Sequence, residues 1–316
     1  MARTRDRSLW RVDAKLLEEA QDDATRLAVA DQEEAGLDIL TDGEVRRESY
    51  SNRFATALEG IDDEHPGQAP GRGNSGATMA VPRIIGPISR RGPVEVGDVR
   101  FLRSLTDRPI KITIPGPFTM SQQAVDDFYH DERAAALAYA GPVREEIADL
   151  FAAGADIVQL DEPFMEARAE KAHAFGVEVV NAALEGAAGT TVLHLCFGYA
   201  ALVRDKPGAY SFLSELAGAN VDQISIESAQ PNLDCSVLSR LSNKSIVLGV
   251  IDLGTEEVEP PATIVARVES ALKFVKPEAL VLAPDCGMKF LSRSSALAKL
   301  HSMVGAAQVL RKRFGE

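Results

Sequence analysis

The stretch FAAGADIVQLDEP, residues 151–163, decides the fold class. It combines the end of a helical pattern, a glycine suited to a helix C-terminus and a short, mostly apolar run at residues 157–160. Such a run is typical of a strand that is buried on both faces of a parallel sheet. The same succession recurs in EEAGLDILTDGE, residues 33–44, and in LAGANVDQISIES, residues 216–228. The repetition predicts βαβ units and an α/β fold.

Alternating strand and helix patterns continue along the chain. We predict seven strands, at residues 38–41, 110–114, 157–160, 192–195, 223–226, 245–250 and 279–282. We predict helices at residues 13–34, 131–152, 168–183, 262–275 and 292–312, and we expect Pro142 to start, kink or split the second of them. A closed (β/α)8 barrel needs eight strands. We therefore expect a barrel whose first strand is missing or replaced.

The chain shows no clear domain boundary, so we predict a single barrel domain over residues 1–316. Residues 62–77 are rich in glycine and proline and predict a loop. Residues 82–100 suggest a β-hairpin above the barrel. Together these segments predict an insertion at about residues 62–100.

Composition and charge argue against several classes of partner. The net charge of −13 disfavours nucleic acid, whose phosphates require clustered Lys and Arg. The charged N-terminus predicts no secretory signal, and no apolar run reaches the length of a membrane span. Three cysteines do not make a disulfide framework, so we expect a cytoplasmic protein. The sequence leaves open whether the chain forms a homo-oligomer.

One histidine, two cysteines and one glutamate lie at the ends of three predicted strands. His194 and Cys196 are two residues apart in LHLCFG, so their side chains share one face of a strand. Glu227 and Cys286 lie at or just beyond the ends of two other strands. The carboxyl ends of barrel strands meet at one mouth, so the four side chains would converge there. Thiolates, an imidazole and a carboxylate are accepted by tetrahedral Zn²⁺, and the pattern predicts a zinc site.

Each of these residues alone has an ordinary structural explanation, because cysteine is often buried filler and histidine is often a satisfied core residue. Their joint position at strand ends favours zinc. Cys235 has no such partners, and we expect it to be structural. A thiol that coordinates zinc is deprotonated. We therefore expect a substrate thiol to become the nucleophile that attacks an electrophilic carbon.

Acidic residues follow two further predicted strands. Asp42 and Glu44 lie in TDGE, and Asp161 and Glu162 lie in QLDEP. These residues also have structural explanations: the two aspartates could cap helices, and the two glutamates could be surface charges. At a common mouth these carboxylates would bind and position a substrate ammonium. Arg46, in the following RRE run, would hold a substrate carboxylate or lie in a solvated loop.

The motifs TDGExxR, xIPGPxT, QxDEP, HxC, a strand-end Glu and PDCGxK occur in this order from Thr41 to Lys289. The set resembles the catalytic domain of cobalamin-independent methionine synthase, whose barrel superfamily includes uroporphyrinogen decarboxylase. The resemblance implies a (β/α)8 TIM barrel that binds zinc through the four strand-end residues named above. It implies a methyltransferase of the 5-methyltetrahydropteroyltriglutamate–homocysteine S-methyltransferase type. It also implies that Glu44 and Asp161, our candidate catalytic residues, hold the amino group of homocysteine.

The chain departs from the family pattern in four ways. From this sequence we expect neither the N-terminal duplicate barrel nor the family's first catalytic-barrel strand, whose Gly-Ser touches homocysteine in the family. Residues 120–123 stand where the folate enzyme has a tryptophan, and Gly254 and Thr255 stand where it has a histidine. The zinc part of the pattern is complete, whereas the folate part is not. We therefore expect the methyl donor to be a methyltetrahydrofolate or a methylcorrinoid.

Our leading hypothesis is a zinc-dependent S-methyltransferase that converts homocysteine to methionine. The alternative is a zinc-dependent alkyl or methyltransferase that uses another thiol, such as coenzyme M, or a corrinoid protein. Glu44 and Asp161 favour an amino-acid thiol, because a sulfonate thiol has no ammonium to bind. A porphyrin decarboxylase needs no zinc ligands. A non-catalytic binding protein of the same fold would tolerate loss of the metal residues, and all four are present.

Overall fold

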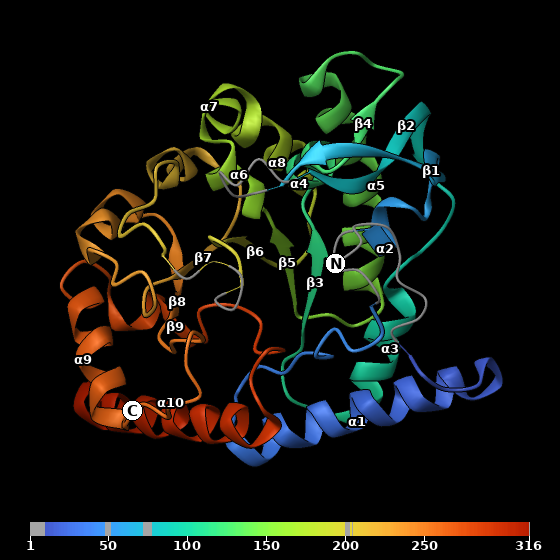
Figure 1. The fold of residues 1–316 in the computed structure, drawn as a ribbon. Coiled ribbons are helices and arrows are strands. Elements are labelled where there is room, and N and C mark those ends of the chain that lie inside the picture. The colour runs from blue at the N-terminus through green and yellow to red at the C-terminus, as the bar shows by residue number, and fades with distance from the viewer. Residues whose placement is uncertain (1–9, 48–51, 72–77, 200–202, 204, 316) are drawn as a thin grey trace.

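The computed structural model describes residues 10–47, 52–71, 78–199, 203 and 205–315 of the chain. Its centre is a six-stranded parallel sheet (Figure 1). In spatial order the strands are β3 (Lys111–Pro115), β5 (Ile157–Asp161), β6 (Thr190–Leu195), β7 (Gln223–Glu227), β8 (Ser245–Gly249) and β9 (Leu280–Ala283). Spatial order equals chain order, which is the order that successive βαβ units produce.

A seventh strand position is marked by Leu40, which forms one parallel bridge with Ile110 beside β3. The seven predicted strands are therefore all found, the first as this single bridge. Within the described residues, no strand pairs with the outer side of β9 or of Leu40. Residues 1–9, where an element replacing the first barrel strand would begin, lie outside the described part of the chain.

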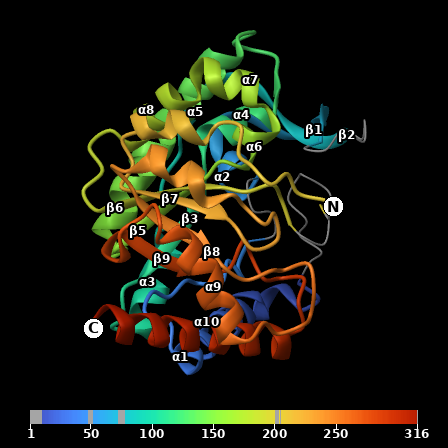
Figure 2. The ribbon, with the colours of Figure 1, turned by 90° about the vertical axis from the view of Figure 1, so that its left-hand side faces the viewer.

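Long helices cover the sheet. They are α1 (Leu17–Ala35), α3 (Val96–Leu105), α5 (Glu132–Ala152), α8 (Val177–Leu184), α9 (Pro261–Ala271) and α10 (Arg293–Phe314). Figures 1 and 2 show α1 and α10 side by side at one end of the molecule, and the two helices are in contact. Among the described residues, no helix has the length and apolar character needed to span a bilayer.

Short helical segments connect these elements. They are η1 (Ala14–Leu16), α2 (Asn52–Ala55), α4 (Pro117–Gln122), α6 (Pro163–Ala167), α7 (Ala169–Lys171), η2 (Ala172–Gly176), η3 (Leu213–Gly218), η4 (Cys235–Leu241) and η5 (Pro277–Ala279). The helix predicted at residues 168–183 is the succession α7, η2 and α8. Helix α5 continues through Pro142, so Pro142 neither starts nor splits the helix, and the kink stays a prediction. Pro142 is buried, and packing of the surrounding helix compensates for its missing N–H.

The two faces of the sheet differ in character. On β5, Val158 and Leu160 belong to the large core shared with the helices, whereas Ile157 belongs to a small apolar cluster with Val192 and Val247. We call the face that carries this small cluster the inner face. Because side chains alternate along a strand, Asp161 lies on the inner face above Ile157. The inner face therefore changes from apolar to polar toward the carboxyl ends of the strands.

A second, three-stranded sheet lies beside the main one. It contains β1 (Leu58–Pro70), β2 (Thr78–Arg90) and β4 (Val125–Asp126). The hairpin spans residues 58–90 rather than the predicted 82–100, and its first strand includes residues predicted as loop. The insertion at about residues 62–100 stays a prediction. Two register irregularities in β1 accommodate its glycines and prolines. Residues 72–77 of the predicted loop lie outside the described residues.

The final part of the predicted hairpin is helical. Helix α3 covers residues 96–105, and it buries Val96, Val99 and Leu102. Their spacing of three residues is that of one helix face, and this periodicity should have outweighed the hairpin interpretation.

Candidate active site

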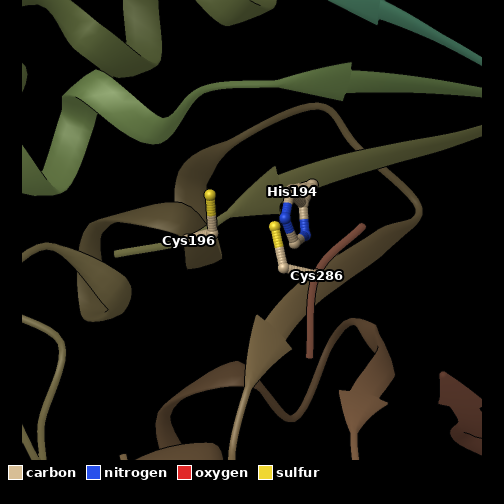
Figure 3. Close-up of side chains that lie close together, drawn as sticks. All are labelled: His194, Cys196 and Cys286. Atoms are coloured by element: carbon tan, nitrogen blue, oxygen red, sulfur yellow. The ribbon is translucent and has the colours of Figure 1, made fainter. Parts of the chain in front are cut away.

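Three of the predicted metal ligands lie together at the carboxyl ends of the strands. His194 and Cys196 come from the end of β6, and Cys286 follows β9 (Figure 3). Their ligand atoms all lie within 4.8 Å of one another, so the three side chains could hold one metal ion. His194 and Cys196 are buried, and Cys286 is half-buried. We call these three residues the metal cluster.

Ser225 orients the histidine of the metal cluster. It lies on β7 directly opposite His194, and its Oγ is 2.9 Å from His194 Nδ1. A histidine that binds metal usually uses its second ring nitrogen for such a hydrogen bond. The contact with Ser225 engages Nδ1, so Nε2 is the ring nitrogen that could bind a metal. The sequence analysis missed Ser225, although its position two residues before Glu227 places it on the inner face.

Asp285 connects the loop of Cys286 to the loop that follows β7. Its carboxylate accepts hydrogen bonds from the backbone N–H groups of Ser228, Ala229 and Gln230, at 3.1, 3.0 and 2.7 Å. Gly249 on β8 makes this approach feasible, because a Cβ there would lie 2.5 Å from Asp285 Oδ1. Asp285 is thus a structural anchor for Cys286, and its adjacency to the cysteine in PDCG was the available signal.

Glu227, the fourth predicted ligand, lies at the end of β7 and is fully buried. Its Oε2 accepts a hydrogen bond of 2.6 Å from Lys206 Nζ, and its Oε1 has no hydrogen-bond partner among the described residues. Its backbone N–H donates to Tyr210 Oη at 2.8 Å. The metal cluster itself does not include Glu227. The sequence analysis did not identify Lys206, because it lies in a loop with no motif around it.

The electrostatics of this region reflect crowded acidic groups. Burial and the nearby Cys196 raise the pKa of Glu227 to about 8, against the opposing effect of Lys206. Hydrogen bonding to Cys196, together with burial, raises the pKa of the Cys286 thiol well above its ordinary value. Burial lowers the pKa of His194, but the neighbouring Cys196 and carboxylates outweigh it and raise that pKa to about 9. Charging several of these groups together is costly unless a cation joins them.

Asp161 and Glu44 lie at the same mouth. Asp161 ends β5 and is in register with His194. Its Oδ1 accepts a hydrogen bond of 2.8 Å from Gln159 Nε2, and Gln159 in turn accepts one of 2.7 Å from Lys111 Nζ. Burial raises the pKa of Glu44 to about 7, and the charge of Asp161 adds to this rise. Two carboxylates that repel each other at the mouth form a suitable site for a cation.

The other two predicted substrate ligands are engaged elsewhere. Asp42 is buried, and its Oδ1 accepts the backbone N–H of Glu44 at 3.0 Å. Arg46 forms ion pairs with Asp22 of α1 and Asp98 of α3. These contacts fix the loop that carries Glu44, and a role for Asp42 and Arg46 in substrate binding stays a prediction.

Glu162 is not the surface charge that the sequence suggested as an alternative. It is fully buried and accepts the backbone N–H groups of Phe118 and Thr119, at 2.9 and 2.6 Å, at the start of α4. Gly116 leaves the room for it, because a Cβ there would lie 2.1 Å from Glu162 Oε1. Glu162 therefore packs directly against the Pro-Gly-Pro loop at residues 115–117. Its carboxylate stabilises α4, because a negative charge at a helix N-terminus interacts favourably with the free backbone N–H groups there.

Tyr199 is a site residue that the sequence did not suggest. Burial raises the pKa of its hydroxyl above the ordinary value, and the charges of Glu44 and Cys286 add to this, so the ring lies close to both parts of the site. Lys289 Nζ lies 4.5 Å from the centre of the Tyr199 ring and 5.2 Å from that of Phe290. These side chains form an aromatic and cationic border beside the metal cluster.

Comparison with known proteins identifies the family. The family model described as "Cobalamin-independent synthase, Catalytic domain" matches residues 2–309. A methionine synthase of Saccharolobus solfataricus is 33% identical over 301 residues, which cover 94% of this chain and 86% of that protein. A methionine synthase of Sulfolobus acidocaldarius is 31% identical over 304 residues, which cover 96% and 85%.

Solved structures agree with this result. A B12-independent methionine synthase from Shewanella sp. W3-18-1, in complex with selenomethionine, superposes with a TM-score of 0.90 at 31% identity and covers 96% of this chain and 92% of that chain. A methyltransferase from Methanosarcina mazei is similar in fold, with a TM-score of 0.64 at 16% identity over 98% of this chain and 95% of that chain. The fold is thus the TIM-barrel type that the sequence predicted. The chain belongs to the family of the cobalamin-independent methionine synthase catalytic domain, whose members are methyltransferases.

Proposed function

We propose that this protein is a zinc-dependent S-methyltransferase that transfers a methyl group to the thiol of homocysteine. The observation that carries the proposal is the metal cluster of two sulfur atoms and one imidazole, whose ligand atoms lie within 4.8 Å of one another. Beside it lie the carboxylates of Glu44 and Asp161, which we call the acidic mouth. One part of the site suits a thiol, and the other suits an ammonium. Family membership supports an enzyme over the non-catalytic binding protein of the same fold.

Zinc is the metal that the donor set favours. Two thiols and an imidazole are soft or borderline ligands, and they suit tetrahedral Zn²⁺ better than Mg²⁺ or Ca²⁺. The unpaired Oε1 of Glu227 supports a fourth ligand at this place, because a buried carboxylate oxygen without a partner is costly. A bound zinc ion would supply one chemical effect, which is to lower the pKa of a substrate thiol.

The acidic mouth would bind the amino group of the substrate. An ammonium between Glu44 and Asp161 would offset their mutual repulsion, and it would lower the pKa of both carboxyl groups. Gln159 donates a hydrogen bond to Asp161, and Lys111 donates one to Gln159. The Asp161 side chain is therefore already ordered, so it loses less conformational freedom when the substrate binds. The amino group would thereby direct the substrate thiol toward the metal cluster.

The second candidate is methyl or alkyl transfer to a thiol without an amino group, such as coenzyme M. The acidic mouth disfavours binding of a sulfonate, because the carboxylates of Glu44 and Asp161 would repel its negative charge. The related Shewanella synthase was solved with selenomethionine, which is an amino acid. For the methyl donor we propose a methyltetrahydrofolate, with a methylcorrinoid as the alternative that the test must separate.

A methyl-transfer assay on one zinc-loaded preparation tests the proposal. Homocysteine and coenzyme M are each offered with methyltetrahydrofolate and with methylcobalamin, and the methylated thiol is quantified. We expect methionine from one of the donors and little methylation of coenzyme M. Methylation of coenzyme M at an equal or greater rate would contradict the proposed substrate.

A further inference from the structure

Lys206 brings a positive charge into the region where the site would hold a metal. Its Nζ lies 2.6 Å from Glu227 Oε2, and both side chains are almost inaccessible, with exposures of 1% and 0%. Lys206 belongs to the segment between β6 and η3, whereas Glu227 ends β7. A buried lysine is rare unless it is paired, so the contact with Glu227 accounts for its position.

Glu227 therefore has two cations that could use its carboxylate. Lys206 occupies Oε2, and a metal at the metal cluster would be the second partner. In the structure the Glu227 carboxylate is hydrogen-bonded to Lys206, and it lies outside the three-residue metal cluster. Two positive charges near one carboxylate repel each other strongly in a buried site, where the effective dielectric constant is low.

We propose that Lys206 is a positioning residue that competes with the metal for Glu227 and so weakens the fourth metal ligand. The inference rests on the zinc site of the proposed function. A catalytic zinc site needs a position that a substrate can take, whereas a structural site is closed by four protein ligands. By holding the carboxylate of Glu227, Lys206 keeps that position available and compensates the buried charge when Glu227 is not on the metal.

Zinc affinity tests the inference without an activity assay. The zinc dissociation constant is measured by competition with a chromophoric chelator for wild type, K206M and K206R. Removing the competing charge should tighten zinc binding about tenfold in K206M, whereas K206R, which keeps the charge, should stay within about threefold of wild type. Unchanged or weaker binding by K206M would overturn the inference, since Lys206 would then be a bystander or a support for the ligand.

A double-mutant cycle shows whether the effect passes through Glu227. In the E227Q background the carboxylate is absent, so the further change K206M should alter zinc affinity less than about threefold. An undiminished effect in that background would overturn competition for Glu227. Cobalt substitution gives a second readout, because the visible spectrum of Co²⁺ responds to the number and type of its ligands.

K244M serves as the matched control. Lys244 donates to the backbone oxygens of Ala219 and Val221, near the start of β7 and away from the metal cluster. Its substitution should leave zinc affinity unchanged, and circular dichroism confirms the folding of every variant. Wild type that binds no zinc would overturn the proposed function together with this inference, whereas equal zinc affinity in wild type and K206M overturns the inference alone.

Discussion

Cys235 is buried and Cys286 is half-buried, and of the two only Cys286 belongs to the metal cluster. Cys235 lies at the start of η4, and its Sγ is 3.7 Å from the backbone oxygen of Leu233. We predict that C286S binds at most about a fifth of the zinc bound by wild type, because it replaces a thiolate ligand. We predict that C235S keeps about one zinc per chain. Metal analysis of the purified variants checks both, and equal zinc contents would show that the wrong cysteine was chosen.

A second prediction concerns the role of Glu44 in binding the amino group of the substrate. E44Q removes a negative charge from the acidic mouth while keeping the size of the side chain. The catalytic efficiency kcat/KM for homocysteine should fall by about tenfold or more, whereas that for a simple alkyl thiol should change little. Parallel assays with the two thiols measure the ratio. Equal losses for both would remove Glu44 from amine recognition.

The raised pKa of Glu44 also predicts a pH dependence. Its folded-state pKa of about 7 lies above the ordinary glutamate value, so the folded state retains a proton that the unfolded state has lost. Stability should therefore fall as pH rises from about 4.5 to about 7, and E44Q should weaken this decline. Chemical denaturation of both proteins at several pH values measures the difference. Identical slopes would show that Glu44 is not buried enough to titrate in this way.

Several site residues could not be found from the sequence, for a common reason. Tyr199 and Lys206 act on partners that are brought close only by the neighbouring strands and loops, whereas the position of Ser225, two residues before Glu227, could have placed it on the inner face. His194 and Cys286 were found because they lie at ends of strands that the βαβ pattern predicts. Glu162 was misjudged, because its role depends on the approach of α4, which strand prediction does not describe.

At the scale of elements, β8 is packed tightly between the loops that carry the site. A Cβ at Gly249 would lie 2.5 Å from Asp285 Oδ1 and 2.9 Å from the backbone oxygen of Ile226. We predict that G249A destabilises the protein by about 1–3 kcal/mol and weakens zinc binding, because Asp285 must move and Cys286 follows it. Urea denaturation and zinc titration measure the two effects.

Gly141 provides the control for this substitution. It lies within α5, and a Cβ there would meet nothing within 4 Å. G141A should leave stability unchanged or increase it by up to about 1 kcal/mol, since alanine is the better helix former. Similar losses in G249A and G141A would mean that close packing at β8 is not the cause.

The main strands were predictable because each is a short apolar run that follows a helical segment, as the βαβ pattern requires. The hairpin was not, because β1 contains glycines and prolines whose cost is offset by register irregularities and by pairing with β2. The start of helix α3 was also assigned to the predicted hairpin, although the spacing of Val96, Val99 and Leu102 indicated a helix. The type of an element could thus be predicted where the local sequence pattern was followed, and could not be predicted where tertiary pairing overrides local preference.

At the scale of the whole molecule, the metal cluster joins distant parts of the sheet. His194 belongs to β6, Cys196 directly follows it, and Cys286 follows β9, the last strand of the sheet order. A metal ion would therefore link β6 to the segment after β9, which the sheet connects through β7 and β8. Zinc at 100 times its dissociation constant should stabilise the folded state by about 2.7 kcal/mol and raise Tm by about 5 °C.

Removing the metal with a chelator should reverse this shift, and C286S should show little of it. Differential scanning calorimetry on the chelated and reloaded protein measures the change. An identical Tm in both states would mean that zinc does not bind the folded protein at these residues.

Under the proposed function, this chain methylates homocysteine only with zinc in the His194, Cys196 and Cys286 cluster. The most direct test removes the metal, measures methionine formation, restores one equivalent of zinc and measures it again in the same preparation. We predict that activity falls at least about hundredfold on removal and returns on reloading. Methionine formed at an undiminished rate by the metal-free protein would contradict the account.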